Sequence, residues 1–251
     1  RGDHVRLYFQ NPRTLGRFRQ GAHGAQKIPR RARADHRGGV EGRRLEPGEL
    51  VKAMLKDWRK LFNKELPFYY VELANYKDVQ TEPIEDWGLI RERQADVLEL
   101  PKTGVATAVD VGQADNVHFW NKKPVGIRLA RLALVNDYGM AKSFDSAGCP
   151  ELEDFKIEGD KVYLKIRHAG KGLKLREGLD KPQGFAICAQ DGKWVWADSV
   201  KLDKDVITVS DSKIKKPKAV RYAWAQNPYT SVENSDGFAL RPLRTDKDSE
   251  F

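Results

Sequence analysis

The sequence predicts an α/β fold, in which a three-layer unit built on a parallel sheet precedes an antiparallel β-sandwich. Helix-like and strand-like segments alternate within residues 47–141, whereas only short strand-like segments follow within residues 152–246. Alternation of this kind is typical of parallel strands covered by helices on both faces of the sheet. The first 46 residues show no sustained period and are expected to be irregular.

Five segments make up the first unit. A helix beginning at Pro47 carries apolar residues at helical spacing: Leu50, Val51, Met54, Leu55, Trp58, Leu61 and Phe62. We then expect a buried strand over Pro67–Asn75, a helix over about Glu85–Leu98, a strand over about Val105–Val111, and a helix over about Lys122–Asn136 that stops near Gly139. Ligand sites in such sheets lie at the carboxyl ends of the strands, which indicates the loop Gly112–Asn121.

The second unit contains short runs of alternating or β-branched residues. They are Phe155–Ile157, Val162–Ile166, Phe185–Ile187, Trp194–Trp196, Val206–Val209 and Val220–Trp224. The pairs Gly159-Asp160 and Asp191-Gly192 are typical of the tight turns that join antiparallel strands. Several short strands at this spacing predict a β-sandwich.

The net charge of +9 is concentrated at the amino-terminal end. Residues 1–46 hold eleven Arg and one Lys against four acidic residues, and so carry eight of the nine positive charges. The rest of the chain is almost neutral and uses 10 Arg against 23 Lys, a different preference. Three interpretations of this Arg-rich segment stay open: a nucleic-acid-binding arm, a solvated tail, or a segment translated out of frame. We expect it to be disordered or out of frame, with no nucleic acid as partner.

The composition excludes several classes of protein. Hydrophobic residues make up 40% of the chain, as in globular proteins, and no run approaches the roughly 18 apolar residues that a membrane span needs. Cys149 and Cys188 are the only cysteines, and their spacing fits neither a metal site nor a redox motif. We therefore expect no membrane partner, no metal and no cofactor.

Asp115 and His118 form an Asp-x-x-His pair on the loop Gly112–Asn121. This resembles the pair of SGNH-type hydrolases, whose catalytic domain is a flavodoxin-like, three-layer unit on a parallel sheet; the resemblance implies that this chain holds part of such a domain. In such a pair the imidazole takes a proton from a serine hydroxyl and later returns it to the leaving alcohol, while the carboxylate fixes the tautomer of the ring. A histidine on a loop can also be purely structural, so the flanking sequence is needed to decide.

The flanks of His118 resemble the end of the catalytic domain in sialate O-acetylesterases. The matching residues are His118, Asn121, Lys122, Val125, Gly126, Arg128, Leu129 and Ala130. Further matching stretches include Lys56–Arg59, Pro67–Asn75, Leu89–Gln94, Gly184–Ile187, Val195–Asp198, Val220–Trp224, Asn227-Pro228 and Arg244–Asp246. The resemblance covers residues 50 to 246 and implies that residues 47–141 are the carboxy-terminal part of an SGNH hydrolase domain.

The resemblance also implies a function. The whole enzyme would be a carboxylic ester hydrolase that removes acetyl groups from a carbohydrate by a Ser-His-Asp mechanism without a metal. His118 and Asp115 would be its catalytic residues, an acetylated carbohydrate its substrate, and the periplasm or the cell exterior its location. The segment that begins at Arg1 contains no apolar signal region.

Three departures from the pattern bear on activity. Phe119 stands where these proteins usually have proline, and they often place an aspartate at the position of Asn116. The nucleophilic serine should precede the histidine in the chain, but the first serine here is Ser143. Without nucleophile or oxyanion donors, the chain is expected to be inactive on esters by itself.

The alternative function is that of a non-catalytic, carbohydrate-binding module on the β-sandwich. Its sugar platform would consist of Trp194, Trp196 and Trp224, although alternation along the strands favours core packing for these rings. His168, in a turn of the expected sandwich, is interpreted as structural, and Asp57, Glu72 and Asp110 are given no functional role.

Overall fold

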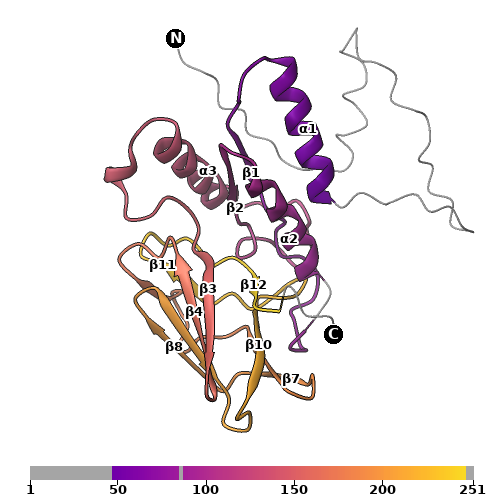
Figure 1. Ribbon diagram of the computed structural model, residues 1–251, viewed down its shortest axis with the longest axis vertical. Coiled ribbons are helices and arrows are strands. Elements are labelled where there is room, and N and C mark those ends of the chain that lie inside the picture. Colours follow the sequence, from indigo (N-terminus) through magenta and orange to yellow (C-terminus); the bar gives the residue numbers. More distant parts are fainter. Residues whose placement is uncertain (1–46, 85–86, 247–251) are drawn as a thin grey trace, which may run out of the picture.

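The structure is a computed structural model that describes residues 47–84 and 87–246. The predictions for residues 1–46 lie outside the described residues. Figure 1 shows the helices gathered at one end of the molecule and the antiparallel strands at the other. The elements of the first unit are α1 (Pro47–Leu61), β1 (Phe68–Val71), α2 (Gly88–Ala95), the 3-10 helix η2 (Asp96–Glu99), β2 (Thr103–Ala106) and α3 (Lys123–Asn136), and the short η3 (Ala141–Ser143) leads to the strands.

The strands β1 and β2 form a two-stranded parallel sheet, in which Phe68 pairs with Thr103 and Val71 with Ala106. Successive side chains of β1 point to opposite faces of the sheet. Tyr69 packs under α3, in a cluster with Ala106, Val125, Leu129 and Leu132. Phe68 and Tyr70 pack on the other face, in a cluster with Leu55 of α1 and Val97 of η2. The unit therefore has the predicted helix, sheet and helix layers.

Both strands of this sheet are shorter than the sequence predicts. The expected strand Pro67–Asn75 ends at Val71 because side chains take the next backbone groups: the Leu73 N–H donates to Gln94 Oε1, and Arg91 donates to the carbonyl oxygen of Leu73. The expected strand Val105–Val111 instead runs from Thr103 to Ala106. At its end the carbonyl oxygen of Thr107 accepts a hydrogen bond from Arg128. A residue distant in sequence thus ends each strand.

The helix predictions hold best where apolar residues repeat regularly. The helix predicted from Pro47 and the one predicted over Lys122–Asn136 are confirmed as α1 and α3, and Gly139 after α3 has the left-handed φ of 70°. The helix predicted over Glu85–Leu98 is α-helical only over Gly88–Ala95 and continues as η2. Residues 85 and 86 lie outside the described part of the chain.

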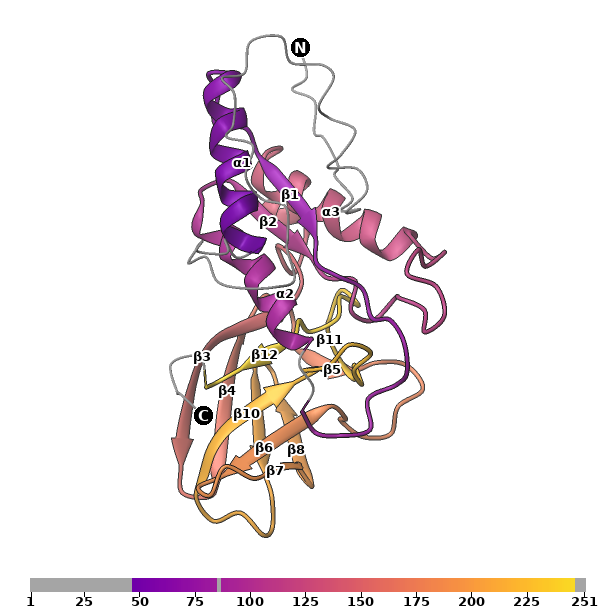
Figure 2. The same cartoon turned by 90° about the vertical axis from the view of Figure 1, so that its right-hand side faces the viewer.

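The second unit contains two four-stranded antiparallel sheets, whose strands Figure 2 shows, and residues of both sheets form one core. The strand order in one sheet is β3 (Glu151–Glu158), β4 (Lys161–Arg167), β9 (Val206–Ser210) and β8 (Ser199–Asp203). The order in the other is β12 (Leu243–Arg244), β10 (Pro217–Tyr222), β6 (Phe185–Ala189) and β7 (Trp194–Trp196). A small sheet pairs β11 (Val232–Asn234) with β5 (Leu173–Leu175). The core includes Leu164, Ile187, Ile207 and Tyr222.

All six predicted strand segments of this unit fall on observed strands, with one correction. The segment Val220–Trp224 is a strand only to Tyr222, because Ala223 has a φ of 51° and leaves the extended conformation. The sequence did not predict β5, β8, β11 or β12, of which three are only two or three residues long. Within residues 47–84 and 87–246, no helix has the length and apolar character that crossing a bilayer requires.

Buried arginines join the two units. Arg91 of α2 donates hydrogen bonds to the carbonyl oxygens of Leu73 and Ala74 in the first unit and of Ala225 and Gln226 in the second. Burial lowers the pKa of this guanidinium to about 10. A second link pairs Arg241 of the second unit with Glu72, the residue directly after β1. These contacts fix the antiparallel sheets against the carboxyl ends of the parallel strands.

Candidate active site

His118 lies on the loop that leaves the sheet at the carboxyl end of β2 and leads to α3. Its side chain is exposed, as is that of Asp115. Two apolar neighbours on the loop are also exposed: Val117 by 59% and Trp120 by 82%. The imidazole is therefore presented to solvent on a loop that begins at the sheet edge where α/β proteins bind their ligands.

Local hydrogen bonds shape the tip of this loop. The backbone N–H of His118 donates to Oδ1 of Asn116 at 2.9 Å, and the N–H of Trp120 donates to Oε1 of Gln113 at 3.0 Å. Phe119 turns inward and packs with Val125 and Leu129 beneath α3. Because its neighbour in the chain is buried, His118 stands on an anchored turn rather than on a free segment.

The predicted pair of Asp115 and His118 shares this turn, but the described residues show no hydrogen bond between the carboxylate and the imidazole. Asn116, where similar sequences often have aspartate, uses its side chain to accept from the His118 backbone. Catalytic hydrogen bonds are often long in the absence of substrate and shorten in the reacting complex. The geometry thus brings both residues to one place without assigning the partner of the ring.

The base of the loop is held by the segment that follows β1. The N–H of Gly112 donates to Oδ1 of Asn75 at 2.6 Å, and the N–H of Lys77 donates to the carbonyl oxygen of Ala114 at 2.9 Å. A Cβ atom on residue 112 would lie only 2.0 Å from the carbonyl oxygen of Asn75. Glycine is therefore required at this position.

Asp110, to which the sequence assigned no role, pairs with Arg128 just before the loop. Both carboxylate oxygens accept from the guanidinium at 2.7 Å, and both side chains are buried. Arg176 of the second unit approaches the same carboxylate at 3.7 Å. This ion pair fixes the start of the loop against α3, so Asp110 has a structural function.

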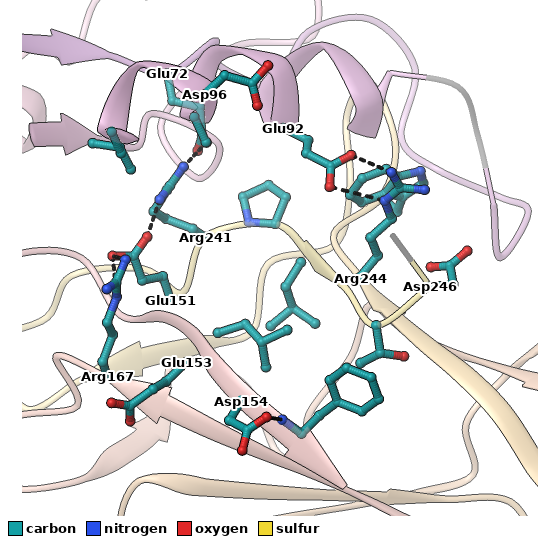
Figure 3. Close-up of a pocket in the computed structure, with 18 of the residues that line it drawn as sticks. Glu72, Glu92, Asp96, Glu151, Glu153, Asp154, Arg167, Arg241, Arg244 and Asp246 are labelled. Atoms are coloured by element: carbon teal, nitrogen blue, oxygen red, sulfur yellow. Dashed lines mark hydrogen bonds and ion pairs between the residues drawn. The ribbon is translucent and has the colours of Figure 1, made fainter. Parts of the chain in front are cut away.

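A separate hollow of about 860 Å³ lies between α2 with η2 and the edge strand β3. Figure 3 shows Arg241 between Glu72 and Glu151, and Arg244 opposite Glu92. The hollow contains neither His118 nor Asp115, and ion pairs between the two units occupy much of its wall. We therefore place the candidate site at the loop of His118 and not in this hollow.

Other candidates of the sequence have structural surroundings. Trp224 is only 5% exposed, and the guanidinium groups of Arg221 and Arg244 lie 5.3 and 5.4 Å from the centre of its ring. Trp194 and Trp196 are half-buried on β7. His168 has a φ of 62° in a tight turn, and burial lowers its pKa. These environments favour packing over sugar binding for Trp224 and support the structural interpretation of His168.

His, Cys, Asp and Glu side chains are the usual metal ligands, and a cysteine can also supply a reactive thiolate. Across the part of the chain that the structure describes, no group of three or more His, Cys, Asp and Glu side chains is arranged to hold a metal ion. Cys149 and Cys188 are both buried and unbridged. Burial raises the pKa of the Cys149 thiol to about 11, so this residue is a poor nucleophile near neutral pH.

Sequence reasoning missed the residues that hold the loop in place. Asn75 and Asn227 both lie in stretches that resemble the acetylesterases, yet nothing in the sequence indicated that they meet. In the structure, Nδ2 of Asn75 donates to Oδ1 of Asn227 at 2.7 Å. The signal that was available was an asparagine at the end of a predicted strand, followed later by a glycine in the candidate loop.

Comparison with known proteins gives one informative result. No protein-family model matches the chain, and no curated protein matches it significantly. Among solved structures, the chain is similar to a carbohydrate acetylesterase from Xanthomonas citri, with a TM-score of 0.72 and 33% identical residues. The match covers 80% of this chain and 46% of that protein, so the chain spans less than half the length of its structural relative.

Proposed function

We propose that this chain is the histidine-bearing, carboxy-terminal part of an SGNH-type carbohydrate O-acetylesterase similar to the sialate O-acetylesterases. The observation that carries the proposal is the exposed imidazole of His118 on an anchored turn of the loop that follows the carboxyl end of β2. Two further findings support it: the structural similarity to a carbohydrate acetylesterase and the residues flanking His118 that resemble such enzymes.

In this proposal His118 is the general base and later the general acid of acyl transfer. Its ring would accept the proton of a serine hydroxyl as the oxygen attacks the acetyl carbonyl, and would return that proton to the leaving sugar hydroxyl. Asp115 would orient the ring and stabilise its cation. Because Asp115 is exposed in the absence of substrate, we expect this hydrogen bond to form only when the site closes around its substrate.

The serine would come from the portion of the acetylesterase that this chain does not span. No serine precedes Ser143, and the match covers 46% of the similar protein. The edge of β1 supports the same view. In the described residues β1 pairs only with β2, so the backbone groups of Tyr69 and Val71 face an edge that no strand occupies. Parallel sheets of two strands seldom stand alone, and a further strand at this edge would complete a larger sheet.

The substrate class that we propose is an acetylated carbohydrate. Trp120 lies two residues after His118 and is 82% exposed, which makes its ring available to stack on the apolar face of a sugar. The resemblance to sialate O-acetylesterases also leads us to propose a periplasmic or extracellular location. The alternative, a carbohydrate-binding module on the β-sandwich, has less support because Trp224 is buried and its ring already contacts two arginines.

The first experiment is hydrolysis of p-nitrophenyl acetate by the chain alone. We expect no turnover above that of the His118→Ala variant, because the nucleophile and the oxyanion donors are absent. Clear turnover that depends on His118 would show that another residue of this chain, such as Thr103 or Ser143, acts as nucleophile.

The second experiment supplies the missing part. In a chimera, the matching part of this chain would replace the corresponding 46% of the Xanthomonas citri acetylesterase. We expect esterase activity that falls by about 10³-fold or more in His118→Ala, because loss of a triad member removes most of the acceleration. Circular dichroism of both proteins controls for folding. A folded chimera that is equally active with and without His118 would disprove the role of this histidine.

A further inference from the structure

The loop of His118 is linked to the second unit through two asparagines. At its base, Gly112 donates to Oδ1 of Asn75, and Nδ2 of Asn75 donates to Oδ1 of Asn227. Asn227 lies between β10 and β11 of the second unit and is 6% exposed. The chain of contacts thus begins in the antiparallel part of the molecule and ends at the start of the candidate catalytic loop.

Asn227 makes two further contacts with the segment after β1. Its Nδ2 donates to the backbone carbonyl oxygen of Lys77 at 2.6 Å, and the backbone carbonyl oxygen of Asn227 accepts from the N–H of Gln80 at 2.9 Å. These partners fix both side-chain amides. Oδ1 of Asn75 must face the Gly112 donor, and Nδ2 of Asn227 must face the Lys77 acceptor, so each amide has only one orientation that satisfies its neighbours.

The segments held by these contacts have little regular structure of their own. Glu72–Pro83 and Thr107–Lys122 contain no helix or strand within the described residues. Such segments open locally unless tertiary contacts hold them, and here many of those contacts are hydrogen bonds from side chains to backbone groups. Asn227 meets one of these segments directly and the other through Asn75.

We infer that Asn227 is a positioning residue for His118: it holds Asn75, and Asn75 holds Gly112 at the base of the catalytic loop. The β-sandwich then acts as a brace for the loop rather than as a separate sugar-binding module. This inference rests on the proposed function for the role of His118, whereas the link between Asn227 and the loop can be measured without any ester.

Hydrogen exchange of the full chain, followed by NMR, tests the link. In Asn227→Ala we expect the protection of the Gly112 amide to fall by about tenfold, as for the loss of one supporting hydrogen bond. The imidazole resonances of His118, assigned from the His118→Ala variant, should shift or broaden. The sandwich-core variant Ile207→Val controls for a general loss of stability and should leave both signals in place.

A double variant tests whether the two asparagines act in series. Asn75→Ala removes the acceptor of Gly112 directly, so adding Asn227→Ala should cause no further loss of Gly112 protection. Additive losses would overturn the inference, as would unchanged Gly112 and His118 signals in Asn227→Ala.

A second substitution at Asn227 tests the two contacts of its side chain separately. Asn227→Asp keeps the oxygen that accepts from Asn75 but loses the donor to the Lys77 carbonyl. We expect lower protection of the Lys77 amide, which donates to Ala114, and retained protection of the Gly112 amide. Equal losses at both amides would contradict the inferred division of contacts. If exchange behaves as expected while the chimera needs no His118, the brace stands and the catalytic assignment falls.

Discussion

The carboxylate of Glu72 accepts a 2.8 Å hydrogen bond from Arg241, although the two residues lie 169 positions apart in the chain. Both side chains are almost fully buried: that of Glu72 is 2% exposed and that of Arg241 is 7% exposed. Arg241 also donates to Glu151, which in turn accepts from Arg167. One buried guanidinium therefore pairs with two carboxylates, one from each unit of the molecule, and Arg167 supplies a second positive charge to Glu151.

Removing this guanidinium should destabilise the protein strongly. In Arg241→Met the carboxylate of Glu72 would stay buried without its cation and Glu151 would keep only Arg167, so we expect the free energy of unfolding to fall by about 3–5 kcal/mol. Urea denaturation followed by circular dichroism measures the change. The control Arg167→Met removes an arginine that is half exposed and should cost about 1 kcal/mol or less. Similar losses in both variants would contradict the special role of Arg241.

The same ion pairs predict an acid-sensitive interface. Burial opposes the ionisation of Glu151, but Arg241 and Arg167 outweigh it and hold the pKa of Glu151 below its usual value, with His168 also 3.9 Å away. A carboxyl group whose pKa is lower in the folded state stabilises the protein above its unfolded pKa, and this contribution disappears as the pH falls through the folded pKa. We therefore expect the free energy of unfolding to decline below about pH 4.5, near the unfolded pKa of glutamate.

Urea denaturation at several pH values from neutral to acidic tests this expectation. Glu151→Gln should be less stable than the unmodified chain at neutral pH and should lose less stability on acidification. Glu153→Gln, on an exposed position of the same strand, serves as the matched control and should follow the unmodified chain. An unchanged acid dependence in Glu151→Gln would rule out this carboxylate as its source.

Arg91 should tolerate no replacement, not even by lysine. Its guanidinium reaches four carbonyl oxygens on two segments, and an ammonium group cannot match that planar fork. We expect Arg91→Lys to lower the free energy of unfolding by about 3 kcal/mol, because buried carbonyl groups lose their donors. Arg93→Lys on the same helix, where the side chain is half-buried, should cost clearly less. Thermal and urea unfolding that shows the reverse order would disprove this role.

Local sequence patterns predicted the helices and strands that bury one continuous apolar face. The helices α1 and α3 follow the spacing of Leu55 and Leu129 and their neighbours, and the strands β4 and β9 follow simple alternation. The ends of β1 and β2 could not be predicted in this way. They depend on Arg91, Gln94 and Arg128, which take backbone groups that would otherwise extend the strands.

The candidate site likewise has residues that the sequence predicted and supporting contacts that it did not. His118 and Asp115 could be proposed from a motif, its flanks and its place after a strand. The contacts that hold their loop could not, because Gly112 and Asn75 are 37 residues apart and Asn75 and Asn227 are 152 apart. Glycine and asparagine are also common in any loop, so their presence does not indicate a particular partner.

Gly112 offers the most direct test of the loop geometry. In Gly112→Ala the new Cβ would lie 2.0 Å from the carbonyl oxygen of Asn75, and because that atom belongs to the backbone, the loop itself must move. We expect the free energy of unfolding to fall by about 1–3 kcal/mol, as for other overpacked sites, and the His118 resonances to shift. Gly126→Ala is the matched control, since no atom lies within 4 Å of its Cβ position in α3. Alanine in a helix interior should stabilise by about 0.5–1 kcal/mol. If Gly112→Ala were as stable as Gly126→Ala and left His118 unmoved, the close approach to Asn75 would not constrain the loop of His118.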